Sequence, residues 1–259
     1  MNYETIQFDV DGNVGILTLN RPAMINAINR QMTDELVDFW QKRHEDYEVR
    51  VILLKGNGER GFCSGLDLKD IQAMYAESPV TTASGTYHFQ RRLSLMFRLM
   101  RSAPQPVIAA VHGAAIGGGL SFAYTSDICL ASNDAIFRAQ FINLGAGGAD
   151  MGTSYFLWRI VGLRRAAEML LTGEKVMADE ALRIGLVNHL YPKEELFPAA
   201  LKMAKTMASK SQLALQITKG ALNMALNGLN YEDAVRVEDR GQALLGLAMT
   251  SGINTAIQK

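Results

Sequence analysis

Short apolar runs alternate with amphipathic stretches over the first two-thirds of the chain. Val14–Leu19 and residues 49–55 are aliphatic or β-branched runs bounded by Gly, Asn and Pro, whereas residues 32–44 repeat apolar side chains at helical spacing. The same criteria predict strands at residues 106–111, 127–131, 135–141 and 186–191, and helices at residues 87–101 and 164–171. This alternation of strands and helices predicts an α/β fold.

The pattern changes near Pro192. From there to Ala248 it contains no strand signal, only helical sequence rich in Ala, Leu, Met and Lys. We therefore predict an α/β core over residues 1–191 that holds the candidate site, followed by a C-terminal helical region over residues 192–259. Segment 75–85, where Ser, Pro, Thr and Gly gather, is predicted to be a mobile loop beside the site.

Residues 107–125 are almost free of charge and nearly long enough to cross a bilayer. The segment contains Gly113, Gly117, Gly118 and Gly119, and each glycine costs about 1 kcal/mol in a helix interior. A strand, a glycine turn and a buried helix therefore explain this segment better than a membrane span does.

Composition narrows the function classes. The chain has 259 residues, of which 48% are hydrophobic, so it can bury a full core as one domain or as one domain with an appendage. Its 26 basic and 26 acidic residues cancel, which argues against nucleic-acid or membrane partners. Cys63 and Cys129 lack the spacing of a disulfide framework or a zinc site, so we expect no metal. No secretory signal is visible, and a cytoplasmic location is expected.

Two glycine turns, residues 62–67 and 112–119, each follow a predicted strand and precede a predicted helix. Backbone N–H groups at the start of a helix are unpaired and carry the positive end of its dipole, so such turns can hold an oxyanion. Glycine also allows a ligand to approach the backbone closely. Taken alone, either turn is more often just a tight connection.

Asp150 precedes a Met-Gly-Thr sequence and an apolar helical run. It is either a catalytic carboxylate or a helix N-cap, where Asp is favoured. On the strand predicted just before it, Arg138 and Gln140 alternate with Phe137 and Phe141, so one of these faces lines the pocket. The alternation does not show which face that is.

Several of these segments together resemble the crotonase (enoyl-CoA hydratase/isomerase) superfamily. The matching segments are residues 20–28, 62–68, 113–119, 127–131, 162–173 and 181–187. They occur in the family's order over most of the chain. The resemblance implies a crotonase-like β-β-α superhelix, with a C-terminal helical region that assembles homotrimers, often paired as hexamers.

The resemblance also implies the substrate and its contacts. The partner is an acyl-CoA thioester, with coenzyme A as part of the substrate and no tightly bound cofactor. The backbone N–H groups of Leu66 and Gly118 would form an oxyanion hole for the thioester oxygen. Residues implied to contact the substrate or CoA are Met24, Ala27, Ser64, Gly65, Asp67, Leu68 and Phe141. Met24 stands where the family commonly has a lysine, which argues against a phosphate contact there.

Departures from the family pattern bear on the reaction. The two glutamates that hydratases of the family use would fall at Ser121 and Phe141, and neither side chain moves a proton as a carboxylate does. Asp150 matches the Asp before Gly-Thr in dienoyl-CoA isomerases. The sequence therefore predicts isomerase-type chemistry in which Asp150 carries a proton along the acyl chain.

Two alternatives stay open. With one residue inserted, Asp150 also matches the aspartate nucleophile of 4-chlorobenzoyl-CoA dehalogenases, which would make the chain a hydrolase or dehalogenase. The dehalogenase tryptophan would fall at Phe141, and its histidine near Ser94 or Phe97. The second alternative is a catalytically silent acyl-CoA binder.

Overall fold

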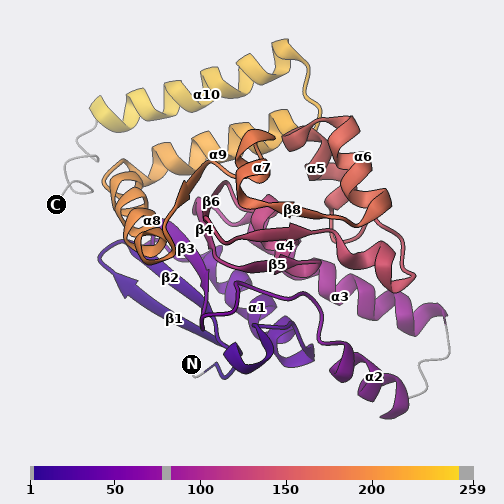
Figure 1. Ribbon diagram of the computed structural model, residues 1–259. Helices are drawn as coiled ribbons and strands as arrows, with labels where there is room; N and C mark the ends of the chain where they lie inside the picture. Colours follow the sequence, from indigo (N-terminus) through magenta and orange to yellow (C-terminus); the bar gives the residue numbers. More distant parts are fainter. Residues whose placement is uncertain (1–2, 78–82, 251–259) are drawn as a thin grey trace.

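The computed structural model describes residues 3–77 and 83–250. Its larger sheet has six strands in the order β1-β2-β3-β4-β6-β9, all parallel to their neighbours except β1, which runs antiparallel to β2. These strands are Ile6–Asp11 (β1), Val14–Leu19 (β2), Val51–Gly56 (β3), Val107–Val111 (β4), Ile128–Ser132 (β6) and His189–Tyr191 (β9). In Figure 1 the sheets run through the centre of the molecule.

The smaller sheet has three strands in the order β5-β7-β8. They are Ala114–Ile116 (β5), Ile136–Arg138 (β7) and Lys175–Met177 (β8). β5 pairs with β7 in parallel and β7 pairs with β8 antiparallel. Since β5 comes directly after β4 and leads into the next helix, this sheet fixes where that helix begins.

Helices surround the sheets. They are Arg30–Arg43 (α1), Leu68–Glu77 (α2), Ala83–Ser102 (α3), Gly118–Thr125 (α4), Thr153–Val161 (α5), Leu163–Thr172 (α6), Ala178–Arg183 (α7), Lys193–Ala208 (α8), Gln212–Leu226 (α9) and Tyr231–Thr250 (α10), with 3₁₀ turns at Pro22–Met24 (η1) and Gln140–Leu144 (η2). Figure 1 shows α9 and α10 side by side along the top of the view and α1 and α3 in its lower part.

Strand β3 illustrates why the larger sheet is buried on both faces. Ile52 and Leu54 point to one core, shared with α1, α3 and α4, whereas Val51 and Leu53 point to a second core, shared with α8. Successive side chains of a strand face opposite sides, so a continuous apolar run is what a doubly covered parallel strand requires. The predicted boundary at residue 191 stays a prediction, and α8, just beyond it, packs on the sheet.

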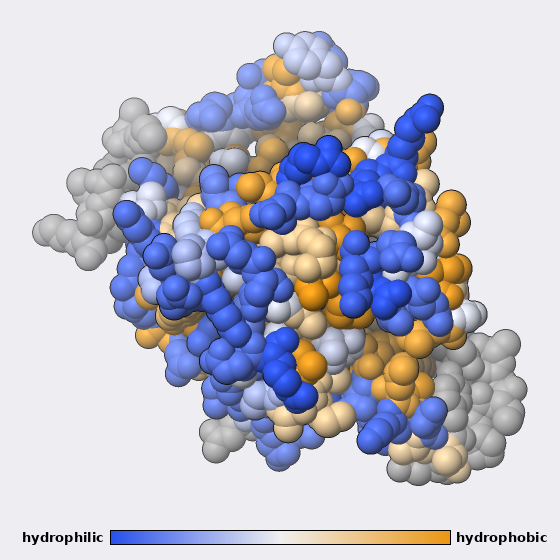
Figure 2. All heavy atoms as spheres, in the orientation of Figure 1, coloured by the Kyte–Doolittle hydropathy of each residue, from blue (hydrophilic) through white to orange (hydrophobic). Residues whose placement is uncertain are grey.

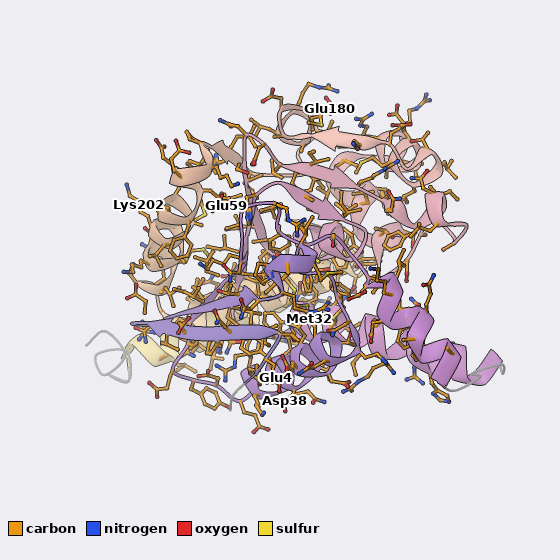
Figure 3. The ribbon with its side chains drawn as sticks, turned by 60° about the horizontal axis from the view of Figure 1, so that its bottom comes forward. Glu4, Met32, Asp38, Glu59, Glu180 and Lys202 are labelled. Atoms are coloured by element: carbon orange, nitrogen blue, oxygen red, sulfur yellow. The ribbon has the colours of Figure 1, made fainter. Side chains whose placement is uncertain are left out.

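The N-terminal segment is fastened to α1 by side-chain hydrogen bonds. The Tyr3 hydroxyl donates to Asp38 at 2.7 Å, and the Glu4 N–H donates to Glu35 at 3.0 Å. Figure 3 shows Glu4 and Asp38 near the same edge of the fold, with Met32 inside and Glu180 at the opposite end. Met32 is fully buried, so α1 turns its apolar face to the sheet and its acidic face to the N-terminal segment.

Helix α9 is joined to the core through a buried lysine. Lys219 Nζ lies 2.9 Å from Asp127 Oδ2 and donates to the Gln105 carbonyl at 2.9 Å. Burial lowers the pKa of Lys219, and the neighbouring Asp127 carboxylate opposes that shift. Because an unpaired buried charge is costly, this pair fixes the place of α9 on the core.

Some helices leave apolar side chains uncovered. Figure 2 shows hydrophobic patches among the mainly hydrophilic side chains of the face seen in Figure 1. Exposed leucines lie on α6, α9 and α10, and they include Leu163, Leu171, Leu222 and Leu247. The single chain therefore does not cover every apolar face of its helices, and the predicted assembly into trimers or hexamers stays a prediction.

Residues 107–125 have the predicted form. They comprise β4, a turn at Gly113, the short strand β5 and the fully buried helix α4. Across residues 3–77 and 83–250, no helix has both the length and the apolar character needed to cross a membrane. The α/β class and the C-terminal helical region are likewise confirmed.

The strand predicted at residues 135–141 is wrong in its second half. β7 ends at Arg138, and residues 140–144 form η2. The partner strand β5 stops at Ile116, and the Gly117 N–H makes the last ladder bond, to the Arg138 carbonyl at 2.9 Å. Without a partner the extended backbone ends there, so Phe141 lies on a 3₁₀ turn and the predicted alternation of faces does not reach it.

The loop predicted at residues 75–85 is also wrong at both ends. Residues 75–77 belong to α2 and residues 83–85 to α3, while the central part of the predicted loop, residues 78–82, lies outside the described residues. Helix α3 therefore begins earlier than the apolar periodicity from residue 87 predicts. Its first turn lacks a repeated apolar position, which is why the sequence pattern missed it.

Candidate functional site

The two glycine turns identified in the sequence lie against each other. The Cys63 N–H donates to the Ala114 carbonyl at 2.9 Å, and the Ile116 N–H donates to the Cys63 carbonyl at 3.0 Å. These bonds extend the pairing of the smaller sheet to the turn at residues 62–67. Two segments about 50 residues apart in the chain are thus held in one register.

Glycine is required where the two turns touch. Gly65 has φ of +92°, and a Cβ built on it would lie 2.8 Å from the Ile116 carbonyl oxygen and 3.5 Å from the Gly118 nitrogen. A Cβ on Gly119 would overlap the Cys63 carbonyl oxygen. The turns can approach this closely only because these positions carry no side chain.

Two backbone donors are left unpaired at this contact. Within the described part of the chain, the N–H groups of Leu66 and Gly118 make no hydrogen bond. Bonds on either side hold Leu66 in place, from the Ile28 N–H to the Gly65 carbonyl at 2.7 Å and from the Asp67 N–H to the Ile28 carbonyl at 2.9 Å. Gly118 is the first residue of α4, so its N–H lies at the positive end of a helix. The pair can bind one partly negative oxygen.

Segment 24–27, which contains two residues predicted to contact the substrate or CoA, lies beside the first turn. Ser64 makes two hydrogen bonds to this segment. The Ser64 N–H donates to the Ile25 carbonyl at 2.9 Å, and the Ser64 hydroxyl donates to the Met24 carbonyl at 3.1 Å. Met24 is exposed at the end of η1, whereas Ala27 is buried. Asn26 is fully buried and its side chain donates to the Phe62 carbonyl at 2.9 Å, which ties the two segments together.

The Asp67 side chain holds the local structure of this region together. Its carboxylate accepts from Arg21 at 2.9 Å and from the Asp70 N–H at 3.3 Å, so it caps α2. Burial favours the neutral acid, but the bonds from Arg21 and the Asp70 N–H outweigh it and hold the pKa of Asp67 below its usual value. The neighbouring Leu68 side chain is exposed. The Asp67 side chain is thus occupied within the fold, and that of Leu68 is open to a ligand.

The first position where the family resemblance expects a hydratase glutamate is filled by a buried hydroxyl pair. Ser121 is fully buried, and its Oγ lies 2.7 Å from the Tyr124 hydroxyl, which donates to the Met151 carbonyl at 2.9 Å. Burial raises the pKa of Tyr124 above its usual range. The Met151 sulfur lies 3.9 Å from Ser121 Oγ. It would also lie 3.8 Å from a Cβ on Gly118, so Met151 borders the unpaired N–H.

The second such position is apolar. Phe141 is buried on η2, and its ring would lie 3.6 Å from a Cβ built on Gly117. The ring thus covers the turn just before Gly118. Of the substrate residues predicted from the resemblance, Gly65, Leu66, Gly118 and Phe141 gather at this point.

Asp150 has one occupied and one free oxygen. Its Oδ1 accepts from the Met151 N–H at 2.7 Å and from the Gln90 amide of α3, whereas Oδ2 accepts no hydrogen bond from any residue that the structure describes. Burial raises the pKa of Asp150, and the bonds from Met151 and Gln90 oppose that shift. A half-buried carboxylate with a free oxygen and a raised pKa is suited to proton transfer.

The N-cap alternative for Asp150 is wrong. Helix α5 begins at Thr153, and its N-cap is Gly152, without a side-chain capping bond. The Asp150 carboxylate points instead to Gln90, and only its backbone N–H and carbonyl bond to Thr153. Sequence reasoning missed Gln90 and Tyr124 because neither belongs to the motif around Asp150. Their contacts join positions 60 and 26 residues apart.

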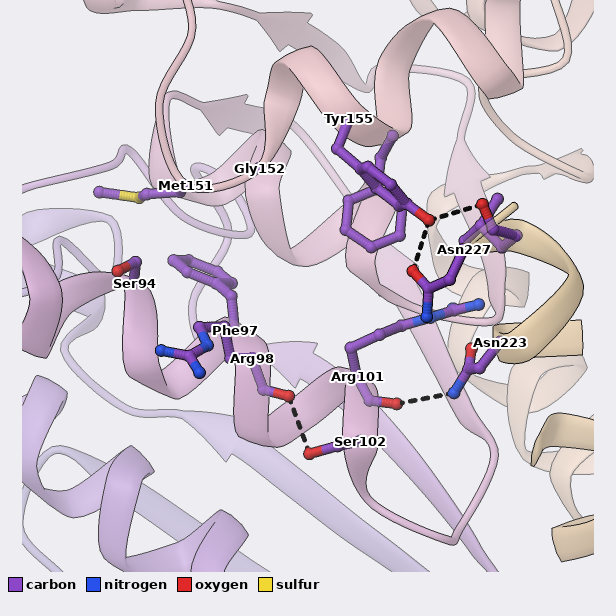
Figure 4. Close-up of a pocket in the computed structure, with 12 residues that line it drawn as sticks. Ser94, Phe97, Arg98, Arg101, Ser102, Met151, Gly152, Tyr155, Asn223 and Asn227 are labelled. Atoms are coloured by element: carbon purple, nitrogen blue, oxygen red, sulfur yellow. Dashed lines mark hydrogen bonds between the residues drawn. The ribbon is translucent and has the colours of Figure 1, made fainter. Parts of the chain in front are cut away.

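A cavity of about 570 Å³ opens beside Met151, between α3, α5 and α9 (Figure 4). Its apolar wall comprises Phe97, Met151, Phe156 and Leu226. The Tyr155 hydroxyl donates to the Leu226 carbonyl at 2.6 Å and closes the wall between α5 and α9. The cavity shares Met151 with the unpaired donor of Gly118, so it is adjacent to the two turns.

Comparison with known proteins decides the family. A family model described as enoyl-CoA hydratase/isomerase matches residues 9–244. The chain belongs to this family. This enoyl-CoA hydratase/isomerase family member is 37% identical over 241 residues to a probable enoyl-CoA hydratase of Mycobacterium bovis, covering 93% of the chain and 84% of the relative.

The relatives of this chain include proteins named as hydratases and as isomerases. The chain is 36% identical over 225 residues to the mitochondrial Delta(3,5)-Delta(2,4)-dienoyl-CoA isomerase of Rattus norvegicus, covering 84% of the chain and 68% of the relative. Its structure matches that of an enoyl-CoA hydratase of Mycobacterium smegmatis with a TM-score of 0.86, at 29% identity over 98% of this chain and 97% of the other. The crotonase-like fold is thereby confirmed, and the protein is an acyl-CoA enzyme of the hydratase/isomerase type.

Proposed function

We propose that this enzyme moves a double bond along the acyl chain of an enoyl-CoA, with Asp150 as the proton carrier. The observation that carries the proposal is the Oδ2 of Asp150, which accepts no hydrogen bond from the residues that the structure describes, on a half-buried carboxylate whose pKa burial raises. Asp150 is bonded through its side chain to Met151, which borders Gly118. The proton carrier and the thioester site are therefore neighbours.

The thioester oxygen lies between the N–H groups of Leu66 and Gly118 in this mechanism. Asp150 removes a proton from a carbon of the acyl chain, and the electron pair moves toward the carbonyl oxygen, which becomes an enolate. Each backbone donor aimed at that oxygen contributes about 2.7–4 kcal/mol to stabilising the charge. Asp150 then returns the proton to a different carbon, and the double bond has moved without gain or loss of atoms.

Hydration would require a group that activates water. At the two positions where the resemblance places hydratase glutamates, the Ser121 hydroxyl is bonded to Tyr124, and Phe141 has no titratable group. The 36% identity to a dienoyl-CoA isomerase also supports isomerisation. Coenzyme A enters and leaves with each substrate in this proposal, as its thioester carrier.

The mass of product and enzyme tests the proposal. Incubation with enoyl-CoA thioesters that differ in double-bond position should give a product of unchanged mass and a shifted double bond, measured by mass spectrometry and by the absorbance of the conjugated thioester. Gain of the mass of water would identify a hydratase. Acyl mass on the intact protein during turnover would identify Asp150 as a nucleophile instead. If the protein converts none of a broad set of acyl-CoA thioesters, it is a binder of acyl-CoA and not an enzyme.

Gln90 gives the proposal a pH signature. The Gln90→Leu variant loses a hydrogen bond that favours the charged form of Asp150, so the pKa of Asp150 should rise further above that of an ordinary aspartate. Because the proposed base acts when ionised, the acidic limb of the kcat profile should move to higher pH. Gln41→Leu, a change of an exposed side chain on α1, is the matched control. An unchanged acidic limb would show that Asp150 does not set it.

A further inference from the structure

The cavity beside Met151 has a wall whose charge is unlike that of the whole chain. Among the described residues its lining includes Arg98 and Arg101 but no acidic side chain, although acidic and basic residues balance over the full sequence. Figure 4 shows Met151 and Ser94 at one end of the cavity and Arg101, Ser102 and Asn223 at the other, with Arg98 between them. One region of the cavity therefore carries excess positive charge.

Neighbouring carboxylates do not cancel this charge. Asp127 lies 3.0 Å from Arg101 and 2.9 Å from Lys219, so one carboxylate serves two cations. The Arg98 guanidinium forms no ion pair or hydrogen bond with the described residues. Arg98 is exposed on α3 and free to meet an anion in the cavity.

Two polar atoms on the same wall also lack partners. Arg101 Nε and Asn223 Oδ1 are buried and have no hydrogen bond within the described chain. Asn223 uses its amide nitrogen to bond the Arg101 carbonyl at 3.3 Å, so its oxygen remains unpaired. Both atoms lie behind the cavity surface, so they make this part of the wall polar but offer a ligand no direct contact.

The cavity also has the length to separate a reacting end from a distal end. On α3 its lining runs from Ser94 to Ser102, about 12 Å of helix at 1.5 Å per residue. Met151, beside Gly118, marks the end next to the thioester site. Phe97 and Phe156 provide apolar surface between the ends. An acyl chain that enters past Met151 would lie against these rings and meet Arg98 part-way along the wall, before Arg101 at the far end.

We propose that the acyl group carries a carboxylate at its distal end and that Arg98 binds it. The substrate class is then the mono-CoA thioester of an unsaturated dicarboxylic acid. The inference rests on the proposed function in placing the acyl group in this cavity. A guanidinium presents two parallel N–H donors that match a carboxylate, and Arg98 is the arginine of the cavity that no carboxylate in the described part of the chain pairs with.

Binding of saturated acyl-CoA thioesters tests the inference, because they cannot be isomerised. Pairs of equal chain length, one ending in a methyl group and one in a carboxylate, are titrated calorimetrically into the full-length protein. We expect the carboxylate-ended thioester to bind about tenfold more tightly at its best chain length, and Arg98→Gln to abolish that preference. Arg91→Gln removes an exposed charge from the same helix outside the cavity and should preserve it.

Three results would overturn the inference. The first is equal affinity of the two thioesters for the unaltered protein, and the second is a preference that survives Arg98→Gln. The third is a loss of affinity for free coenzyme A in that variant that equals the loss for the carboxylate-ended thioester, which would assign Arg98 to the CoA phosphates. The assay involves no turnover. If the protein prefers the carboxylate-ended thioester but isomerises no enoyl-CoA, only the proposed function is refuted. Isomerisation without the preference would refute the inference alone.

Discussion

Replacing Asp150 by asparagine should lower kcat by about 100- to 10,000-fold, the usual contribution of a general acid–base group. The asparagine oxygen can still accept from the Met151 N–H and the Gln90 amide, so the turn keeps its bonds and loses only the proton carrier. Steady-state kinetics with an enoyl-CoA substrate measures the loss. The affinity for a saturated acyl-CoA should stay within about twofold, since the backbone donors are unchanged.

The same variant should be as stable as the unaltered protein or more stable. Burial raises the pKa of Asp150 in the folded protein, so this group stabilises the fold when protonated, and that contribution is lost as pH rises through the raised pKa. At neutral pH the ionised carboxylate is a cost that Asp150→Asn removes. Thermal unfolding at neutral pH should therefore give an equal or higher Tm.

Asp9→Asn is the matched control for Asp150→Asn. Asp9 is an exposed aspartate on β1, and both kcat and Tm should be unchanged there. If Asp150→Asn retains full kcat, the proposed proton transfer is refuted. If it loses activity only because Tm falls sharply, Asp150 acts by holding the turn and not by chemistry.

Substituting Gly65 by alanine should lower kcat/KM by about 100- to 1,000-fold, the effect of losing one oxyanion donor. The new Cβ would lie 2.8 Å from the Ile116 carbonyl oxygen and 3.5 Å from the Gly118 nitrogen, so the two turns must separate. The donors of Leu66 and Gly118 could then no longer aim at one oxygen. Kinetics and the affinity for acyl-CoA both measure this change.

Three further variants distinguish geometry from general instability. Gly12→Ala places a Cβ at φ of +61° with open space around it, so it should cost about 1–2 kcal/mol of stability and no activity. Gly118→Ala would bring a Cβ within 2.7 Å of the Ile28 Cδ1 atom. Adding Ile28→Val removes that atom and should restore part of the activity. If Gly65→Ala is folded and fully active, the proposed oxyanion site is refuted.

Buried elements with apolar periodicity were predictable from the sequence, whereas the edge strand β1 was not. The aliphatic run Val14–Leu19 is recognisable because both faces of β2 are covered. Strand β1 is absent from the predictions because Gln7 and Asp9 interrupt its apolar pattern at the sheet edge. It forms through full antiparallel pairing with β2, a nonlocal contact that local sequence does not reveal.

The candidate site was predictable where backbone conformation depends on residue type. The glycines at 65 and 118 mark the turns because another residue would collide there, and that requirement is visible as sequence. The state of Asp150 was not predictable in this way. Its partner Gln90 comes from α3, and only the packing of α3 against the turn brings their side chains together.

Because α9 closes the cavity, the groups that carry out the reaction and the wall that surrounds the acyl group come from different parts of the chain. The proposed proton carrier and the backbone donors belong to residues 62–67 and 112–150, whereas Asn223, Leu226 and Asn227 form a wall that Lys219 fastens from the C-terminal region. Sequence drift in α9 can therefore reshape the space for the acyl group while the reacting centre stays intact. Relatives that share one reaction can in this way accept different acyl groups through substitutions in the C-terminal region.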